Sequence, residues 1–225
     1  MTALSTLTRN ALHTQHTLQS RDIFLICQLA STSAGAENTL EEIQSWSFEQ
    51  FFGFACHLFI TTESSNIRKQ LAGLLPKFGV IATLSLVKIV HYFDLHDRNQ
   101  SGSNPHFPTE VKELALQALE NMPVQTLASG LAQMIEEDTH SILRPTVAAF
   151  LARVFYKKEE DILSLLSQYL SKDSWYAIEA SLVQELSSPQ HEQVVVGKSN
   201  NGKFNNICAF QARTSLAEKP FTEVA

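Results

Sequence analysis

Apolar residues recur every three to four positions along most of this chain, and this spacing limits the fold more than any other feature. One example is the face formed by Leu127, Leu131, Met134 and Ile135. A helix with such a stripe buries it against neighbouring helices. Only 8 Gly and 7 Pro occur in 225 residues, so few positions interrupt a helix. We therefore expect an all-α fold of antiparallel helix pairs.

The most hydrophobic stretch, VIATLSLVKIVHYF, is apolar on nearly all sides of a helix. A helix of this kind is expected at the centre of the core. Lys88 and His91 interrupt it well before the length that a membrane span requires. The sequence therefore predicts a central soluble helix here and no membrane span.

The second half of the chain has the most regular pattern. Five helices are predicted in it, starting at Pro108, at Pro123, at Asp138 or Thr139, at Glu159, and at Asp173 or Ser174. Pro145, inside the third of these, lies either in a first turn or at a bend. The acidic clusters 136–138 and 159–161 are interpreted as helix ends, where carboxylates face solvent or a helix dipole.

Two changes of composition divide the chain. The segment DRNQSGSNPHF (97–107) gathers Gly, Pro, Ser and Asn without an apolar period, as surface loops do. From about Ser187 the chain is rich in Ser, Asn, Gln and Lys and has no helical period. The predicted organisation is an N-terminal helical region 1–96, a loop 97–107, a helical-repeat-like region 108–186 and a poorly ordered tail 187–225.

Leu131 and Leu165 lie 34 residues apart, each in the first helix of a predicted pair. The surrounding stretch, PVQTLASGLAQMIEEDTHSILRPTVAAFLARVFYKKEEDILSLLSQYLSKD, resembles HEAT or armadillo-type helical repeats, mainly over residues 108–186. The resemblance rests on helix length and apolar spacing, and only LRPTVAAFLARVF approaches the HEAT signature. It implies an α-solenoid with an extended surface for a protein partner. An irregular helical bundle is the alternative.

Charge and cysteine content exclude some classes of function. A net charge of −6 and no dense Lys/Arg block argue against binding of a phosphate backbone, so no nucleic acid is expected as a partner. The three Cys residues are widely spaced, and Cys27 and Cys56 sit in apolar stretches, where thiols act as small hydrophobes. The opening residues lack the apolar core of a secretory signal, so the expected compartment is cytoplasmic.

The segment WSFEQFFGFACHLF crowds five Phe and one Trp together. Its candidate ligand-binding residues are Trp46, Phe52 and His57, which would line an apolar pocket. The alternative is that these aromatic residues fill the core. Cys56 beside His57 is not a nucleophile–base pair, because adjacent helical side chains point in different directions.

The segment HYFDLHD supplies candidate metal ligands. His91 and Asp94 share a helix face, and His96 follows near its end. Imidazole and carboxylate together suit zinc or non-haem iron. A helix C-terminus, where His is favourable beside the dipole, is the alternative. Gly73 and Gly130 are isolated and belong to no phosphate-binding motif. No catalytic residue and no cofactor are predicted.

Two hypotheses of function follow. The first is a non-enzymatic interaction protein, such as a scaffold, adaptor or assembly factor, that binds another protein on a helical surface. The second is a helical enzyme or carrier that holds an apolar ligand, pigment or metal among its aromatic helices. The sequence does not determine an oligomeric state.

Overall fold

The computed structural model of the protein describes residues 16–32, 46–99 and 106–187, with only the backbone described at 96–99, 106–108 and 155–161. These residues form nine helical elements and no strand. Their bounds are α2 Ser20–Thr32, α4 Phe48–Thr61, α5 Ser65–Leu74, the 3-10 helix η1 Leu75–Phe78, α6 Val80–Asn99, α7 His106–Glu120, α8 Val124–Glu137, α9 Arg144–Tyr169 and α10 Lys172–Leu186. The predicted all-α class is confirmed for this part of the chain.

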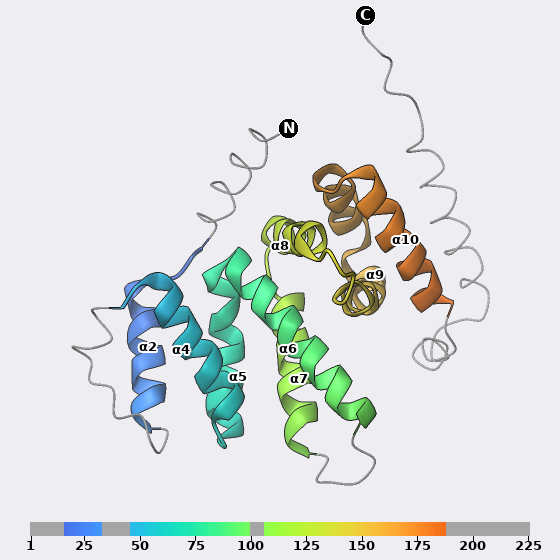
Figure 1. The fold of residues 1–225 in the computed structure, drawn as a ribbon. Helices are drawn as coiled ribbons and strands as arrows, with labels where there is room; N and C mark the ends of the chain where they lie inside the picture. Colours follow the sequence, from blue (N-terminus) through green and yellow to red (C-terminus); the bar gives the residue numbers. More distant parts are fainter. Residues whose placement is uncertain (1–15, 33–45, 100–105, 188–225) are drawn as a thin grey trace, which may run out of the picture.

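The helices follow one another across the molecule in chain order (Figure 1). The first described helix, α2, and the last, α10, lie at opposite ends of the row. In the same view α8 and α9 are seen nearly end-on, whereas α2, α4 and α5 lie nearly in the plane. The direction of the helices therefore turns along the chain.

Contacts between helices follow two patterns. Most neighbours in sequence pack together, most extensively in the pairs α6 with α7, α8 with α9 and α9 with α10. Alternate helices also contact, α5 with α7 and α6 with α8. Both kinds of contact bury the apolar faces of the helices.

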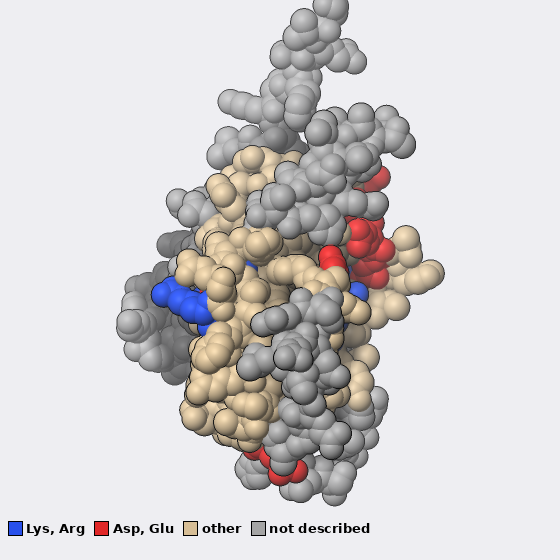
Figure 2. All heavy atoms as spheres, turned by 90° about the vertical axis from the view of Figure 1, so that its left-hand side faces the viewer, with Lys and Arg blue, Asp and Glu red and all other residues tan. Residues whose placement is uncertain are grey.

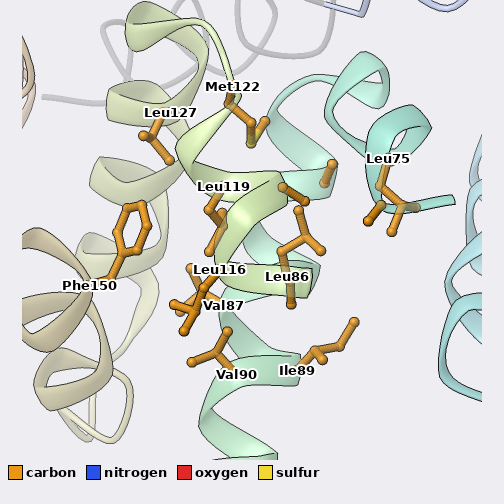
Figure 3. Packing of buried hydrophobic residues seen from close by; sticks show 14 of the residues in the cluster. Leu75, Leu86, Val87, Ile89, Val90, Leu116, Leu119, Met122, Leu127 and Phe150 are labelled. Atoms are coloured by element: carbon orange, nitrogen blue, oxygen red, sulfur yellow. The ribbon is translucent and has the colours of Figure 1, made fainter. Parts of the chain in front are cut away.

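The predicted central role of the most hydrophobic helix is confirmed. Leu86, Val87 and Val90 of α6 point into the layer that also receives Leu119 of α7 and Phe150 of α9 (Figure 3). One continuous cluster of buried side chains runs from α2 to α10. Since α6 contacts η1, α7, α8 and α9, it joins the first half of the chain to the second.

Gly130 allows α8 to approach α6 closely. A Cβ atom placed on Gly130 would lie 2.5 Å from the Cβ of Thr83, a distance at which one helix must move. Thr83 is fully buried, and its hydroxyl donates to Met122 Sδ at 3.3 Å. The absent side chain at 130 thus sets the spacing of these two helices.

Several helix boundaries differ from those expected. α6 continues to Asn99 and α7 begins at His106, so less of the predicted loop 97–107 separates them. Two predicted helices in the second half form the single 26-residue helix α9, and Pro145 occupies its first turn. Apart from Ser187, the predicted tail lies outside the described residues. Within the described parts, no helix combines the length and the apolar character needed to cross a membrane.

Candidate functional site

A groove of about 440 Å³ lies on the surface between α5 and α7. Its walls are polar and its floor is built from small or apolar side chains. The lining residues are Lys69, Ala72 and Gly73 of α5, with Glu110, Glu113, Leu114, Gln117 and Ala118 of α7 and Asn121 just after it. Small residues at the floor allow a ligand to approach the helices closely.

The α5 wall starts at a capped helix end. The Ser64 hydroxyl accepts a hydrogen bond from the Ile67 backbone N–H, which satisfies one of the first amides of α5. Further along, Gly73 faces open space, because a Cβ added there would meet nothing within 4 Å. The groove therefore has no side chain at this lining position, which is exposed.

A partly buried ion pair joins α5 to α7 at one end of the groove. Arg68 is only 1% exposed, and its guanidinium donates to the Glu110 carboxylate and to the Thr62 carbonyl. The Ser65 hydroxyl also donates to Glu110. This bond from Ser65 is the largest cause of the lowered Glu110 pKa; Arg68 and Lys69 also lower this pKa, and burial opposes them.

A second set of ion pairs joins α7 to α9 beside the groove. Arg153 Nη1 lies 3.1 Å from Glu113 Oε2, and Arg153 Nε lies 2.6 Å from Glu120 Oε1. The guanidinium of Arg153 thus bridges two carboxylates that lie about two helical turns apart on α7. Both carboxylates that line the groove, Glu110 and Glu113, are consequently paired with arginine.

Two exposed amides continue the α7 wall beyond Glu113. Gln117 and Asn121 are exposed and line the groove. Among the residues that the structure describes, neither amide side chain has a hydrogen-bond partner. Each amide offers both donors and an acceptor, so together they present ready hydrogen-bonding groups along one side.

The structure places the three aromatic-segment candidates in different surroundings. Phe52 is buried in the core, with its ring 5.0 Å from that of Phe78. Trp46 is half-buried and packs edge-on against Phe54 at 5.2 Å. His57 is exposed. The aromatic residues of this segment that are buried pack in the core cluster.

The metal-ligand candidates point to different neighbours. His91 is half-buried, and its Nδ1 lies 2.8 Å from the Thr146 hydroxyl of α9. Asp94 forms an ion pair with Lys112 of α7. The His96 side chain lies outside the described part of the structure. No group of three or more possible metal ligands is found among the side chains that are described.

The two described cysteines behave as apolar side chains. Cys27 is buried in the core cluster, and burial raises its thiol pKa. Burial also raises the Cys56 pKa to about 12. A thiol with so high a pKa is almost wholly protonated at neutral pH and is a weak nucleophile.

The described part of the surface at the α2 end of the molecule is largely uncharged. Figure 2 shows this end with Lys, Arg, Asp and Glu mainly at its margins. On α2, Phe24 is 61% exposed and Ile23 is 40% exposed. Both side chains thus present apolar surface to solvent.

Reasoning from the sequence missed the α5–α7 groove. The signals were the isolated Gly73 and the polar positions 113, 117 and 121, which are four residues apart along one helix and its C-terminal end. Neither signal shows that α5 lies beside α7.

The chain matches no protein-family model, and comparisons with curated proteins and with solved structures found no match either.

Proposed function

We propose that this protein is a non-enzymatic interaction module that receives a segment of another protein in the groove between α5 and α7. The observation that carries the proposal is the groove itself: an open site of about 440 Å³ with polar walls and an apolar floor. The polar groups can orient a bound segment by hydrogen bonds, and the apolar floor supplies contact area.

The arrangement of helices supports the proposal. A stack in which α5 contacts α7 and α6 contacts α8 leaves grooves between alternate helices along its surface. We propose that the described helices form such a HEAT-like stack. Partners of stacked helices bind on surfaces of this kind, so a groove between alternate helices is a suitable docking site.

Filling the groove from within tests the proposal. Gly73→Leu places a large side chain where the backbone now faces open space, and Leu has a higher helix propensity than Gly. The variant is expected to fold and to lose at least tenfold in affinity for the partner. Gly53→Leu is the matched control, because Gly53 is also an exposed helical glycine with nothing within 4 Å of an added Cβ.

The measurement is a pull-down from the native host with each variant as bait, quantified by mass spectrometry. The proposal is supported by a protein that binds wild type and Gly53→Leu but is depleted with Gly73→Leu. Equal capture by both variants would show that the groove is not the binding surface. Circular dichroism and thermal unfolding of each bait establish that it is folded.

A further inference from the structure

We propose that the segment bound in the α5–α7 groove is an extended peptide without net charge, whose main chain hydrogen-bonds to Gln117 and Asn121. This inference rests on the proposed function and specifies the chemistry of the partner. It follows from the spacing of the wall residues, the shape of the floor and the balance of charges.

The polar groups on the α7 wall match the repeat of an extended chain. Glu113, Gln117 and Asn121 are successive fourth residues, so they form a line along the helix with steps of about 6 Å. Alternate residues of an extended peptide recur every 6.6 to 6.8 Å or so. Successive amides can therefore reach successive outward-facing N–H and C=O groups of a peptide lying along α7.

The floor of the groove favours close approach of a backbone. Gly73 offers no side chain, Ala72 and Ala118 offer only methyl groups, and Leu114 is the single larger apolar residue of the lining. An extended peptide is thin enough to use this space, with small side chains facing the floor. A helical ligand is about 10 Å across and packs at interaxial distances of 8–10 Å, so it would keep its main-chain groups away from the amides.

The charges around the groove balance one another. Arg68 is paired with Glu110, and Arg153 with Glu113 and Glu120. Lys69 on the opposite wall adds a cation close enough to lower the pKa of Glu110. With the carboxylates already paired, the site offers no strong attraction to a highly basic or acidic segment.

The length of the wall fixes the length of the peptide. From Glu110 to Asn121 the wall covers eleven helical steps, about 16 Å. An extended chain covers this distance with about five residues. The expected ligand is thus a segment of about five residues with Gly, Ala or Ser at alternate positions.

The test starts with random octapeptides displayed on phage and selected on the full chain. Enriched peptides are expected to be uncharged in their central part, with small residues at alternate positions. Synthetic copies are then titrated against Gln117→Ala and Asn121→Ala, each expected to bind about three- to tenfold more weakly. Gln70→Ala, which removes an exposed amide of α5 that does not line the groove, is the control.

N-methylation of the peptide backbone supplies a second test of the extended binding mode. Methylating alternate amides of the peptide should weaken binding at one set of positions and leave the intervening positions unaffected. If Gly73→Leu prevents binding but both amide variants bind normally, the groove is used and the extended mode is wrong. If enriched peptides have the i, i+3, i+4 apolar pattern of a helix, the extended mode is also wrong. A selection without any peptide sensitive to Gly73→Leu overturns the proposed function itself.

Discussion

Gly130 lies where α8 approaches α6. Its substitution by Ala should lower the stability of the protein, whereas the same substitution at other helical glycines should raise it. In Gly130→Ala the new Cβ would lie 2.5 Å from Thr83 Cβ. Relieving this overlap costs about 1–3 kcal/mol, against a gain of up to about 1 kcal/mol in helix propensity. We expect a net loss of about 1 kcal/mol in the free energy of unfolding, measured by urea denaturation.

Gly73→Ala and Gly53→Ala are the controls for this prediction. Neither new Cβ meets anything within 4 Å, so each variant should be more stable than wild type by up to about 1 kcal/mol. A Gly130→Ala variant as stable as these two would contradict the close approach of α8 and α6. The sequence shows Gly73 and Gly130 alike as isolated glycines, and only the contact with Thr83 distinguishes Gly130.

Asp22 should make stability depend on acid pH. It is buried, and its carboxylate accepts from Lys77 Nζ at 2.6 Å and from the Gln19 backbone N–H at 2.9 Å. The bond to Lys77 is the largest cause of its lowered pKa, and the Gln19 bond is the next. A carboxyl whose pKa is lower in the folded state stabilises the protein above its ordinary pKa of 3.8 and loses this contribution as pH falls further.

We therefore expect Asp22→Asn to be less stable than wild type at pH 7. The difference between their free energies of unfolding should shrink as pH falls below about 4. Urea denaturation of both proteins at intervals from pH 7 to pH 2.5 measures this difference in the free energy of unfolding. The exposed Glu63, changed to Gln, is the control. A gap between Asp22→Asn and wild type that stays constant with pH would contradict the role of the carboxylate.

At the scale of the element, α9 shows which parts of a helical pattern can be predicted. The acidic cluster 159–161, which follows Lys157 and Lys158, was interpreted as a helix end, yet Lys and Glu are good helix formers. No Gly or Pro occurs between Pro145 and Leu170, so nothing in the local chain ends the helix. The first turn was predictable because Pro is favoured there. Charge patterns alone are thus weak markers of helix ends.

A proline in the middle of α9 tests its continuity. Glu159→Pro removes one backbone hydrogen bond and adds a steric clash with the preceding turn, at a cost of about 3 kcal/mol or more. We expect this loss in the free energy of unfolding, with lower helical content by circular dichroism. An effect below about 1 kcal/mol would indicate two separate helices joined near this position.

For the whole molecule, local patterns predicted the fold class but not the pairing of helices. The apolar period shows which residues of each helix are buried, as with the central position of α6. It does not show that α5 packs on α7, because that contact depends on the angles between all intervening helices. The candidate groove depends on this one pairing, and so it was not predictable. The composition of the aromatic segment suggested a ligand pocket, but its buried aromatic residues pack in the core.

The loop 97–107 was predicted to separate two helical regions. The packing of α6 indicates whether these regions stay associated when the chain is cut within the loop. α6 precedes the cut and contacts both α7 and α8 after it, and the buried cluster is continuous across all three. Separating the halves would expose side chains such as Leu86, Val87 and Leu119, which are almost fully buried. Domains that fold alone have few contacts across their boundary, unlike these two regions.

We therefore expect the two halves to stay together after cleavage. A site for a sequence-specific protease inserted between residues 100 and 105 makes the cut without altering any described residue. The two pieces should co-elute in size-exclusion chromatography and unfold in one transition, whose midpoint rises with protein concentration. Two separately eluting, folded pieces would show instead that the loop is a domain boundary. The uncut protein with the same insertion shows whether the inserted site itself alters folding.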